Sequence, residues 1–417
     1  MKSLKRLFVT GVLSLFFITH LFPAFKSISG IPSENFYIPI WFCTLFFMKP
    51  RVYLTREFFA ASMFLIVHLL YTAAGNYDLL DLRVIQTQGE IFFGVFFALS
   101  LWAYLRLGMD TKLLKTLFWI VIIGSIATSI TTIIAITQNP SAARSLAGND
   151  NQEEVISLLR MNVGGYSFQY FLAMISPLFL YFYRKSKEKL WLIAAIIAGL
   201  SIIYAQIVAI LLVYAINVIM TFALLRGITL RHYLFILFFG IFILIQGKQL
   251  IKDVLYLSAA KLTSFEVIST KLNEVAAYLE TSGNLDYSNA ENIYAYKIRY
   301  DRSKEAFFEA PLFGGTGRSG GHHFWIDNLA EHGVIGTAPW LLVISVFIYS
   351  ARKAFKKEEF LIIFNGVIIF IIIGINKNIL INSMPIYPIF LIPLVILGYK
   401  YTSWNATNKK SLNGNPA

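Results

Sequence analysis

Long apolar runs without charged residues recur along this chain, and they limit its fold more than any other feature of the sequence. A helix needs about 20 mostly apolar residues to cross a bilayer, where lipid offers the backbone no hydrogen-bond partners. Of 417 residues, 57% are hydrophobic and 14% are charged, whereas ordinary soluble domains have about 25% charged residues. The sequence therefore predicts an all-α integral membrane protein.

About twelve segments of the chain are apolar enough to be predicted as membrane helices. They lie at residues 7–25, 36–48, 58–74, 89–107, 113–137, 163–183, twice within 190–225, 233–246, 334–350, 360–375 and 379–399. The two helices within 190–225 are expected to reverse near Tyr204 to Gln206. The first segment is similar to a secretory signal but lacks a small-residue cleavage site, so we expect it to be retained.

Basic residues are distributed unevenly between the two sides of the predicted helices. With a cytoplasmic N-terminus, 22 of the 36 Lys and Arg residues fall on the inside. The short outside segments hold Lys26, Arg83, Arg144, Arg160 and Lys377. Cytoplasmic loops carry an excess of basic residues, so both termini are predicted to be cytoplasmic. Membrane topology then accounts for most of the net charge of +13, and no nucleic-acid partner is expected.

Residues 247–333 form a long outside segment of mixed composition, predicted to be a small folded domain. The resulting organisation is nine membrane helices in 1–246, the external domain, three membrane helices in 334–399, and a cytoplasmic tail, 400–417. Within the domain, residues 290–310 have the apolar spacing of an amphipathic helix that ends at Pro311, with Arg299 and Arg302 on one face. The single cysteine, Cys43, excludes an intramolecular disulfide.

The glycine-rich stretch after Pro311 matches the spacing G-x-G-x-x-G at Gly315, Gly317 and Gly320. A dinucleotide site also needs a preceding strand and a βαβ unit, which the flanking sequence does not predict. Two interpretations stay open. The stretch is either a flexible loop entering a helix or an anion site, in which backbone N–H groups and Arg318 bind a group such as a diphosphate.

His322 and His323 follow this stretch, where the next helix is predicted to begin. An imidazole titrates near neutral pH and can orient or deprotonate a hydroxyl, although a histidine here is also a common interfacial polar residue. Adjacent helical side chains point about 100° apart, and no metal-binding motif accompanies the pair, so no metal is expected. Acidic and polar residues follow within ten positions: Asp327, Asn328, Glu331 and His332.

The stretch HHFWIDNLAEHGVIGT, residues 322–337, resembles the signature of bacterial O-antigen polymerases and O-antigen ligases. His322 falls on the signature histidine, and Gly333, Gly336 and Thr337 match its end. The sequence departs from the family at His323, where Asn, Ser or Gln is usual.

A second, upstream stretch also resembles the family. Tyr300 is followed eleven positions later by Pro311 and then by a glycine turn. The usual arginine before the aromatic residue is replaced by Tyr296, which leaves Lys297 or Arg299 as its substitute. Together the two stretches cover about 45 residues, from Lys297 to Leu342.

The resemblance implies a fold like that of GT-C-type glycosyltransferases, located in the bacterial inner membrane with the large loop in the periplasm. The implied reaction transfers a glycan from undecaprenyl diphosphate to an acceptor hydroxyl, with no metal or other cofactor. The expected partners are the undecaprenyl-diphosphate-linked oligosaccharide and membrane lipid; binding of a chain-length regulator is left open.

The resemblance also implies roles for individual residues. His322 would orient the acceptor as a base, and Gly333 and Gly336 would be structural. The predicted substrate-binding residues are Arg318, Lys297, Arg299, Arg302, His323 and Glu331. Arg144 and Arg160, in another outside loop, would bind sugar or phosphate, or else be solvated loop charges.

Within this family the polymerase is favoured over the ligase. The run from Asp327 to Gly333 is more similar to polymerases, and the turn from Tyr204 to Ile207 lacks the arginine typical of ligases. A lipid-linked oligosaccharide flippase is a third alternative. It would need polar residues lining a cavity in the membrane, whereas His68, Gln169 and Asn217 are predicted to be helix-packing contacts.

Overall fold

The computed structural model describes residues 2–28, 34–74, 92–146, 151–227, 231, 248–261, 263, 266–280, 291–315, 321, 323–377, 379 and 384–412. Every regular element in these ranges is a helix, so the all-α prediction is confirmed for this part of the chain. The predicted membrane helix at 233–246 lies outside the described residues.

The first half of the chain folds into helices that follow the predicted apolar segments. They are α1 (Lys2–Leu21), α2 (Pro23–Lys26), α3 (Glu34–Met48), η1 (Pro50–Leu54), α4 (Arg56–Ala74), η2 (Phe92–Phe96), α6 (Phe97–Arg106), α7 (Thr111–Gln138), α8 (Ala142–Ser145), α9 (Gln152–Arg160), α10 (Tyr166–Ser186), α11 (Lys189–Ala205) and α12 (Val208–Leu225). The expected reversal is confirmed: α11 ends before Gln206, whose left-handed backbone (φ 52°) turns the chain into α12.

The second half contains more polar helices followed by apolar ones. They are α14 (Lys248–Lys261), α15 (Glu266–Glu280), α16 (Glu291–Glu309), α17 (Phe324–Ala354), α18 (Lys357–Asn376), η5 (Tyr387–Leu391) and α19 (Ile392–Leu412). The amphipathic helix predicted at 290–310 is therefore confirmed as α16. The helix predicted to begin at His322 and His323 is α17, which starts at Phe324 and runs through the predicted apolar segment at 334–350.

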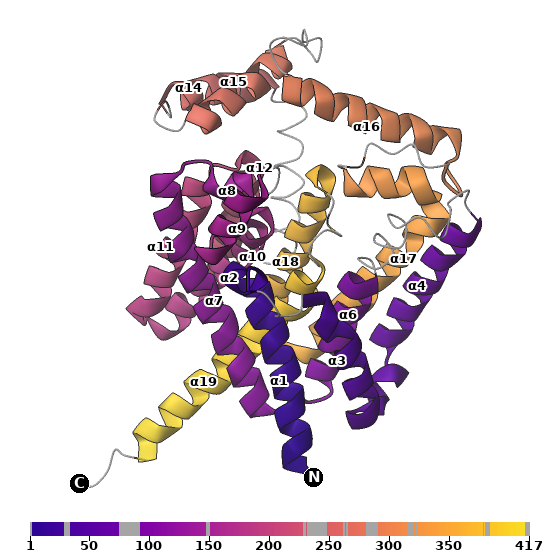
Figure 1. The fold of residues 1–417 in the computed structure, drawn as a ribbon, viewed down its shortest axis with the longest axis vertical. Coiled ribbons are helices and arrows are strands. Elements are labelled where there is room, and N and C mark those ends of the chain that lie inside the picture. The colour runs from indigo at the N-terminus through magenta and orange to yellow at the C-terminus, as the bar shows by residue number, and fades with distance from the viewer. Residues whose placement is uncertain are drawn as a thin grey trace.

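The apolar helices lie side by side in a bundle, with both chain termini at its lower end in Figure 1. The polar helices α14, α15 and α16 lie at the opposite end, where α14 packs against α15 and α16 packs against α17. The start of α1 and the end of α19 thus lie at the same end of the bundle. Which side of a membrane that end faces stays a prediction.

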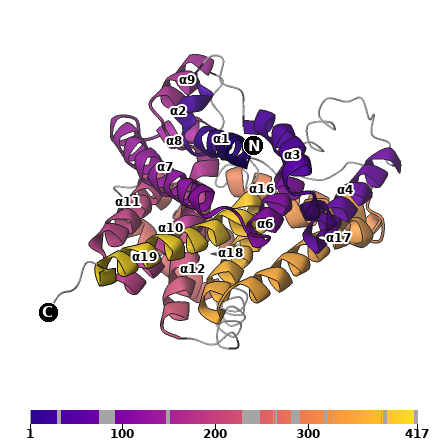
Figure 2. The same ribbon diagram turned by 90° about the horizontal axis from the view of Figure 1, so that it is seen from below.

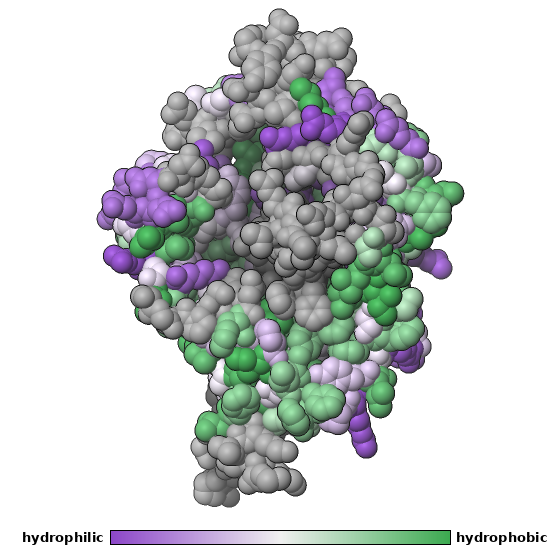
Figure 3. Space-filling model, turned by 45° about the vertical axis from the view of Figure 1, so that its right-hand side comes forward, coloured by the Kyte–Doolittle hydropathy of each residue, from purple (hydrophilic) through white to green (hydrophobic). Residues whose placement is uncertain are grey.

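In the part of the chain that the structure describes, four helices are long and apolar enough to cross a membrane: α7, α12, α17 and α18. Shorter apolar helices lie in 6–21, 36–48, 94–106, 189–205 and 387–402. Large apolar side chains are exposed on the bundle, such as Phe47 (74%) and Ile219 (62%), and hydrophobic residues cover much of the flank seen in Figure 3. Such extended apolar surface is typical of contact with lipid. The number of crossings stays a prediction.

Polar side chains inside the bundle join neighbouring helices. Asn217 of α12 donates to the carbonyl of Ala173 at 2.9 Å and accepts from Asn365 of α18 at 2.6 Å. Gln169 of α10 donates to the hydroxyl of Ser201 at 3.3 Å. These residues therefore make the helix-packing contacts predicted for them.

Candidate active site at the junction of α16 and α17

The helix α16 packs across the start of α17 and carries three of the predicted substrate-binding residues. Ser303 lies on the face of α16 that packs against α17, and it is fully buried. Lys297 and Arg299 are half-buried, and Arg302 is exposed. The junction between α16 and α17 thus has basic side chains on the surface of one of its two helices.

Asp327 links the two helices through its carboxylate. The carboxylate is buried and accepts hydrogen bonds from the Ser303 hydroxyl at 2.5 Å and from the backbone N–H of His323 at 2.7 Å. Hydrogen bonds to an ionised acceptor are short and strong, and an acidic residue in the first turn of a helix is favoured by the helix dipole. Asp327 therefore fixes the chain at residue 323.

His323 precedes α17, and its imidazole ring is held in a single orientation. Its Nδ1–H donates to the backbone carbonyl of Ile375, near the end of α18, at 2.9 Å. The Tyr300 ring lies edge-on to it at a centroid distance of 5.5 Å. Because a carbonyl can only accept, Nδ1 carries the proton in this hydrogen bond. The ring is therefore oriented as a hydrogen-bonding group.

The glycine turn that follows α16 fits into a break in α17. The break is at Gly333, whose φ of 61° and ψ of −170° interrupt the helix. The N–H groups of Val334 and Ile335 donate to the carbonyls of Pro311 (2.9 Å) and Leu312 (3.1 Å). A Cβ atom at Gly333 would lie 2.4 Å from the Leu312 carbonyl carbon. Only glycine combines this left-handed backbone with so close an approach.

Gly336 and His332 connect the junction to α4. A Cβ atom at Gly336 would lie 2.9 Å from the ring of Tyr71. The His332 ring contacts Tyr71 and His68, with centroid distances of 5.5 Å and 5.0 Å. The absence of a side chain at Gly336 thus lets α4 approach α17 next to the break.

The predicted site residues fall into three groups in the structure: those at the junction, those outside the described residues, and the two arginines of α8 and α9. Lys297, Arg299, Arg302, His323 and Glu331 all belong to the junction between α16 and α17, where Glu331 is half-buried beside the glycine turn. His322 and Arg318 lie outside the described residues, so their geometry stays a prediction.

Arg144 and Arg160 lie elsewhere, on the short helices α8 and α9. These helices pack mainly against α7, α11 and α2. The structure therefore gives the two arginines a different neighbourhood from the basic residues of α16.

The described part of the junction offers basic side chains and an imidazole. Among the described residues of the chain, no three His, Cys, Asp or Glu side chains gather in a way that would hold a metal ion. The Asp327 carboxylate is already occupied by Ser303 and His323. Guanidinium and ammonium groups of this kind bind anions, and an imidazole can form a hydrogen bond with a hydroxyl.

Two further basic residues, Lys26 and Lys377, were not predicted as site residues from the sequence. Lys26 and Lys377 line a cavity of about 410 Å³ beside α2, α9 and α10. Both were among the few basic residues on the outside, which is the one sequence signal that could have singled them out. Because they lie at opposite ends of the chain, only the fold shows that they share a cavity.

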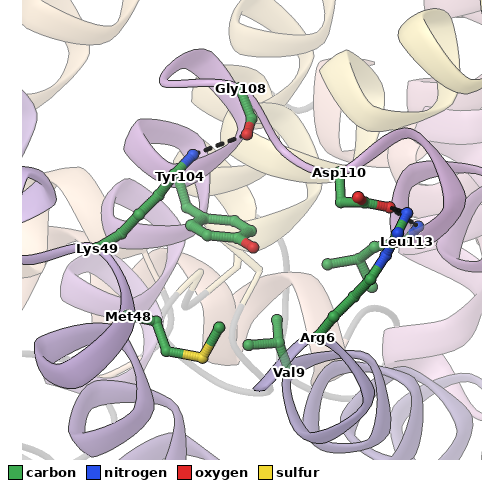
Figure 4. Close-up of a pocket in the computed structure, with 8 residues that line it drawn as sticks. All are labelled: Arg6, Val9, Met48, Lys49, Tyr104, Gly108, Asp110 and Leu113. Carbon is green, nitrogen blue, oxygen red and sulfur yellow. Dashed lines mark hydrogen bonds and ion pairs between the residues drawn. The ribbon is translucent and has the colours of Figure 1, made fainter. Parts of the chain in front are cut away.

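Two other cavities lie at the end of the bundle that holds the termini. In the first, of about 510 Å³, Arg6 pairs with the Asp110 carboxylate, and Lys49 donates to the Gly108 carbonyl at 2.7 Å (Figure 4). In the second, of about 600 Å³, Arg106 pairs with Glu57. These cations bind groups of the protein itself.

Fold and site together define a class: an all-α protein with helices apolar enough for a membrane and a polar helix junction at the end of the bundle opposite its termini. Comparison of the chain with models of known protein families gave no match, and comparison with curated proteins gave none.

Proposed function

We propose that this protein polymerises undecaprenyl-diphosphate-linked repeat units of O-antigen, or of a related surface polysaccharide, at the periplasmic face of the bacterial inner membrane. The supporting observation is the way the two stretches that resemble the family fold onto each other. The turn from Pro311 to Gly315 is hydrogen-bonded to Ala330, Val334 and Ile335, on both sides of the break in α17. Two separate sequence signatures thus contribute to one structural unit.

The reaction is attack by an acceptor hydroxyl on the anomeric carbon of the donor glycan. A new C–O bond forms, the bond to the lipid diphosphate breaks, and the hydroxyl proton passes to a base. We assign His322 as that base. The backbone immediately after it is anchored, because the N–H of His323 binds Asp327 and the ring of His323 binds Ile375.

The departing diphosphate takes two negative charges or more into the site. In this proposal Arg318 and the basic residues of α16, Lys297, Arg299 and Arg302, stabilise that charge as it develops. Fixed cations are effective here because they need little reorganisation in the transition state. Such a leaving group is already activated, so the proposal needs no metal or nucleotide.

A ligase that moves the glycan onto the lipid A core is the second candidate, because the signature around His322 is shared by both enzymes. Its reaction uses the same donor and base and differs only in the acceptor. A flippase is less well supported, since polar groups inside the bundle, such as Asn217 and Gln169, bind neighbouring helices.

Deletion of the gene tests the three candidates by the lipopolysaccharide that remains. Loss of a polymerase leaves core carrying a single repeat unit, because export and ligation still work. Loss of a ligase leaves bare core while polymer accumulates on the carrier lipid, and loss of a flippase leaves bare core without polymer. We expect the first pattern, with long chains restored by the wild-type gene. Bare core with lipid-linked polymer would overturn the polymerase assignment.

A further inference from the structure

The cavity that contains Lys26 and Lys377 is built from parts of the chain that are far apart in sequence. Figures 1 and 2 both place α2, α8 and α9 together, close to the end of α1 that lies away from the N-terminus. The start of α10 and the segment between α18 and η5 complete the lining. The cavity, of about 410 Å³, is separate from the residues described at the junction of α16 and α17.

Asn162 holds these parts in place. Its backbone is left-handed, with a φ of 59°, which is uncommon for a residue other than glycine. Its side chain accepts from the N–H of Ala24 at 3.2 Å and donates to the hydroxyl of Thr128 at 2.9 Å, while its carbonyl accepts from Thr131 at 2.7 Å. The lining contributed by α2 and by the loop before α10 is therefore anchored to α7 before any ligand binds.

The polar lining of the cavity is positively charged. Lys377 is half-buried, and its ammonium group lies 5.5 Å from the centre of the Tyr166 ring. Burial lowers the pKa of Lys377, and an anion beside the ammonium group would offset this effect by stabilising its charged form. Lys26 is exposed at the same cavity, and none of the described residues that line the cavity is an Asp or a Glu.

The first turn of α10 adds to this charge. Gly165, Tyr166 and Ser167 line the cavity at the N-terminus of this 21-residue helix, which has no side-chain cap. The leading N–H groups of a helix have no partner within the helix and carry the positive end of its dipole. The first turn of α10 and two lysines thus line one space, and a helix N-terminus together with cations is suited to phosphate oxygens.

The remaining lining of the cavity is apolar and aromatic. Val155 and Leu159 come from α9, Phe168 and Phe171 from α10, and Met384 from the segment before η5. A small inorganic anion would leave this surface without a partner. A molecule that joins a phosphate to a hydrocarbon chain matches both kinds of lining.

We propose that this cavity binds the phosphate-bearing headgroup of an anionic lipid, with the phosphate at Lys377, Lys26 and the first turn of α10. This inference does not rest on the proposed function, since no step of glycosyl transfer involves these residues. The same chemistry is found in a carrier-lipid diphosphate and in a bulk anionic phospholipid.

Lipid titration of the full-length protein in phosphatidylcholine nanodiscs tests the proposal, with bound lipid counted by native mass spectrometry. The probes are undecaprenyl diphosphate and phosphatidylglycerol. We expect Lys377→Gln combined with Lys26→Gln to weaken binding by about tenfold or more, because the double variant loses both charged hydrogen-bond donors to the phosphate. Lys377→Arg should retain binding. Lys185→Gln is the matched control, since Lys185 already pairs with Glu358.

The two probes separate the sources of the ligand. Selective binding of undecaprenyl diphosphate supports a carrier-lipid site, and equal binding of both probes supports a site for bulk phospholipid. Unchanged affinity in the double variant would overturn the proposal. Photo-crosslinking of a diazirine-bearing lipid phosphate to the wild-type protein is a second test, which maps the labelled residues and needs no variant. Labels should map to α9, to the start of α10 and to the segment around Met384, and labels found only elsewhere would also overturn it.

Discussion

The two ends of the helix bundle use their charged residues differently. At the end that holds the termini, four ion pairs among the described residues join neighbouring helices: Arg6–Asp110, Arg106–Glu57, Lys185–Glu358 and Lys400–Glu359. At the opposite end, Lys377 lies over an aromatic ring beside a cavity, and Arg302 is exposed on α16. The ion pairs at the first end join neighbouring helices, whereas Lys377 and Arg302 lie beside a cavity and on the surface of a helix junction.

The largest effect expected at the end opposite the termini is that of His322→Ala. Loss of a general base costs about 10²- to 10⁴-fold in rate, so transfer should be abolished in a complementation assay for polymer length. Protein level and membrane insertion should stay normal.

His323 gives the matched comparison. His323→Asn should retain transfer, because the amide nitrogen of Asn can replace Nδ1 as donor to the Ile375 carbonyl, and His323→Ala should impair it. If His323→Asn were inactive and His322→Ala active, the alignment of the signature would be wrong by one residue.

The second prediction concerns the break in α17. Gly333→Ala should lower the free energy of unfolding by about 3 kcal/mol, because it adds a left-handed alanine and a clash with the Leu312 carbonyl group. Thermal unfolding in detergent, followed by tryptophan fluorescence, measures this loss. Gly321→Ala is the control: its φ is +77°, but nothing lies within 4 Å of the added Cβ. Equal losses in both variants would show that docking of the turn contributes little.

The smallest effects are expected at the end with the termini, and there they should depend on burial. Arg106→Gln should cost about 2 kcal/mol of stability, because it leaves the buried Glu57 carboxylate without its cation. Lys185→Gln should cost less than about 0.5 kcal/mol, since both partners of that pair are more than two-fifths exposed. Neither substitution should affect transfer by more than its effect on protein level. A loss of transfer in stable protein would contradict the division between the two ends.

The spacing of apolar residues was sufficient to predict helices that keep one pattern, either apolar or amphipathic, along their whole length. The segment predicted at 113–137 became α7 (Thr111–Gln138), and the amphipathic pattern ending at Pro311 became α16. In both, the side chains that determine the helix lie next to one another along the chain. Such local signals are readable without knowledge of the tertiary fold.

The start of α17 was predicted at His322 and His323, but the contacts that bury its first turns were not. Asp327 and Asn328 are polar, yet both are buried, because Asp327 binds Ser303 of α16 and Asn328 donates to Thr337 within α17. A hydropathy pattern assigns such residues to a solvated loop. The contact that stabilises this turn, and the docking of the glycine turn at Gly333, are tertiary and leave no periodic signal.

The candidate site could be predicted only in part for the same reason. The sequence placed Arg299 and Arg302 on one helix, and α16 confirms this. It gave no indication that the ring of His323 would be held by Ile375, which is 52 residues away. It also counted Lys377 only as a topological charge, because its neighbours in the cavity come from other parts of the chain.

The junction and the cavity also differ in how much of the chain must be synthesised before each can form. Ser303 and Asp327 are 24 residues apart, whereas the hydrogen bond between His20 and Tyr387, two residues that line the cavity, joins positions 367 apart. Closing a longer loop costs more entropy, and a nascent chain emerges from its N-terminus. The junction can therefore assemble while the ribosome is still translating the message, and the cavity must wait until Tyr387 of η5 has been synthesised. A nonsense codon between residues 377 and 387 would leave a chain that still contains every described residue of the junction and can never close the cavity.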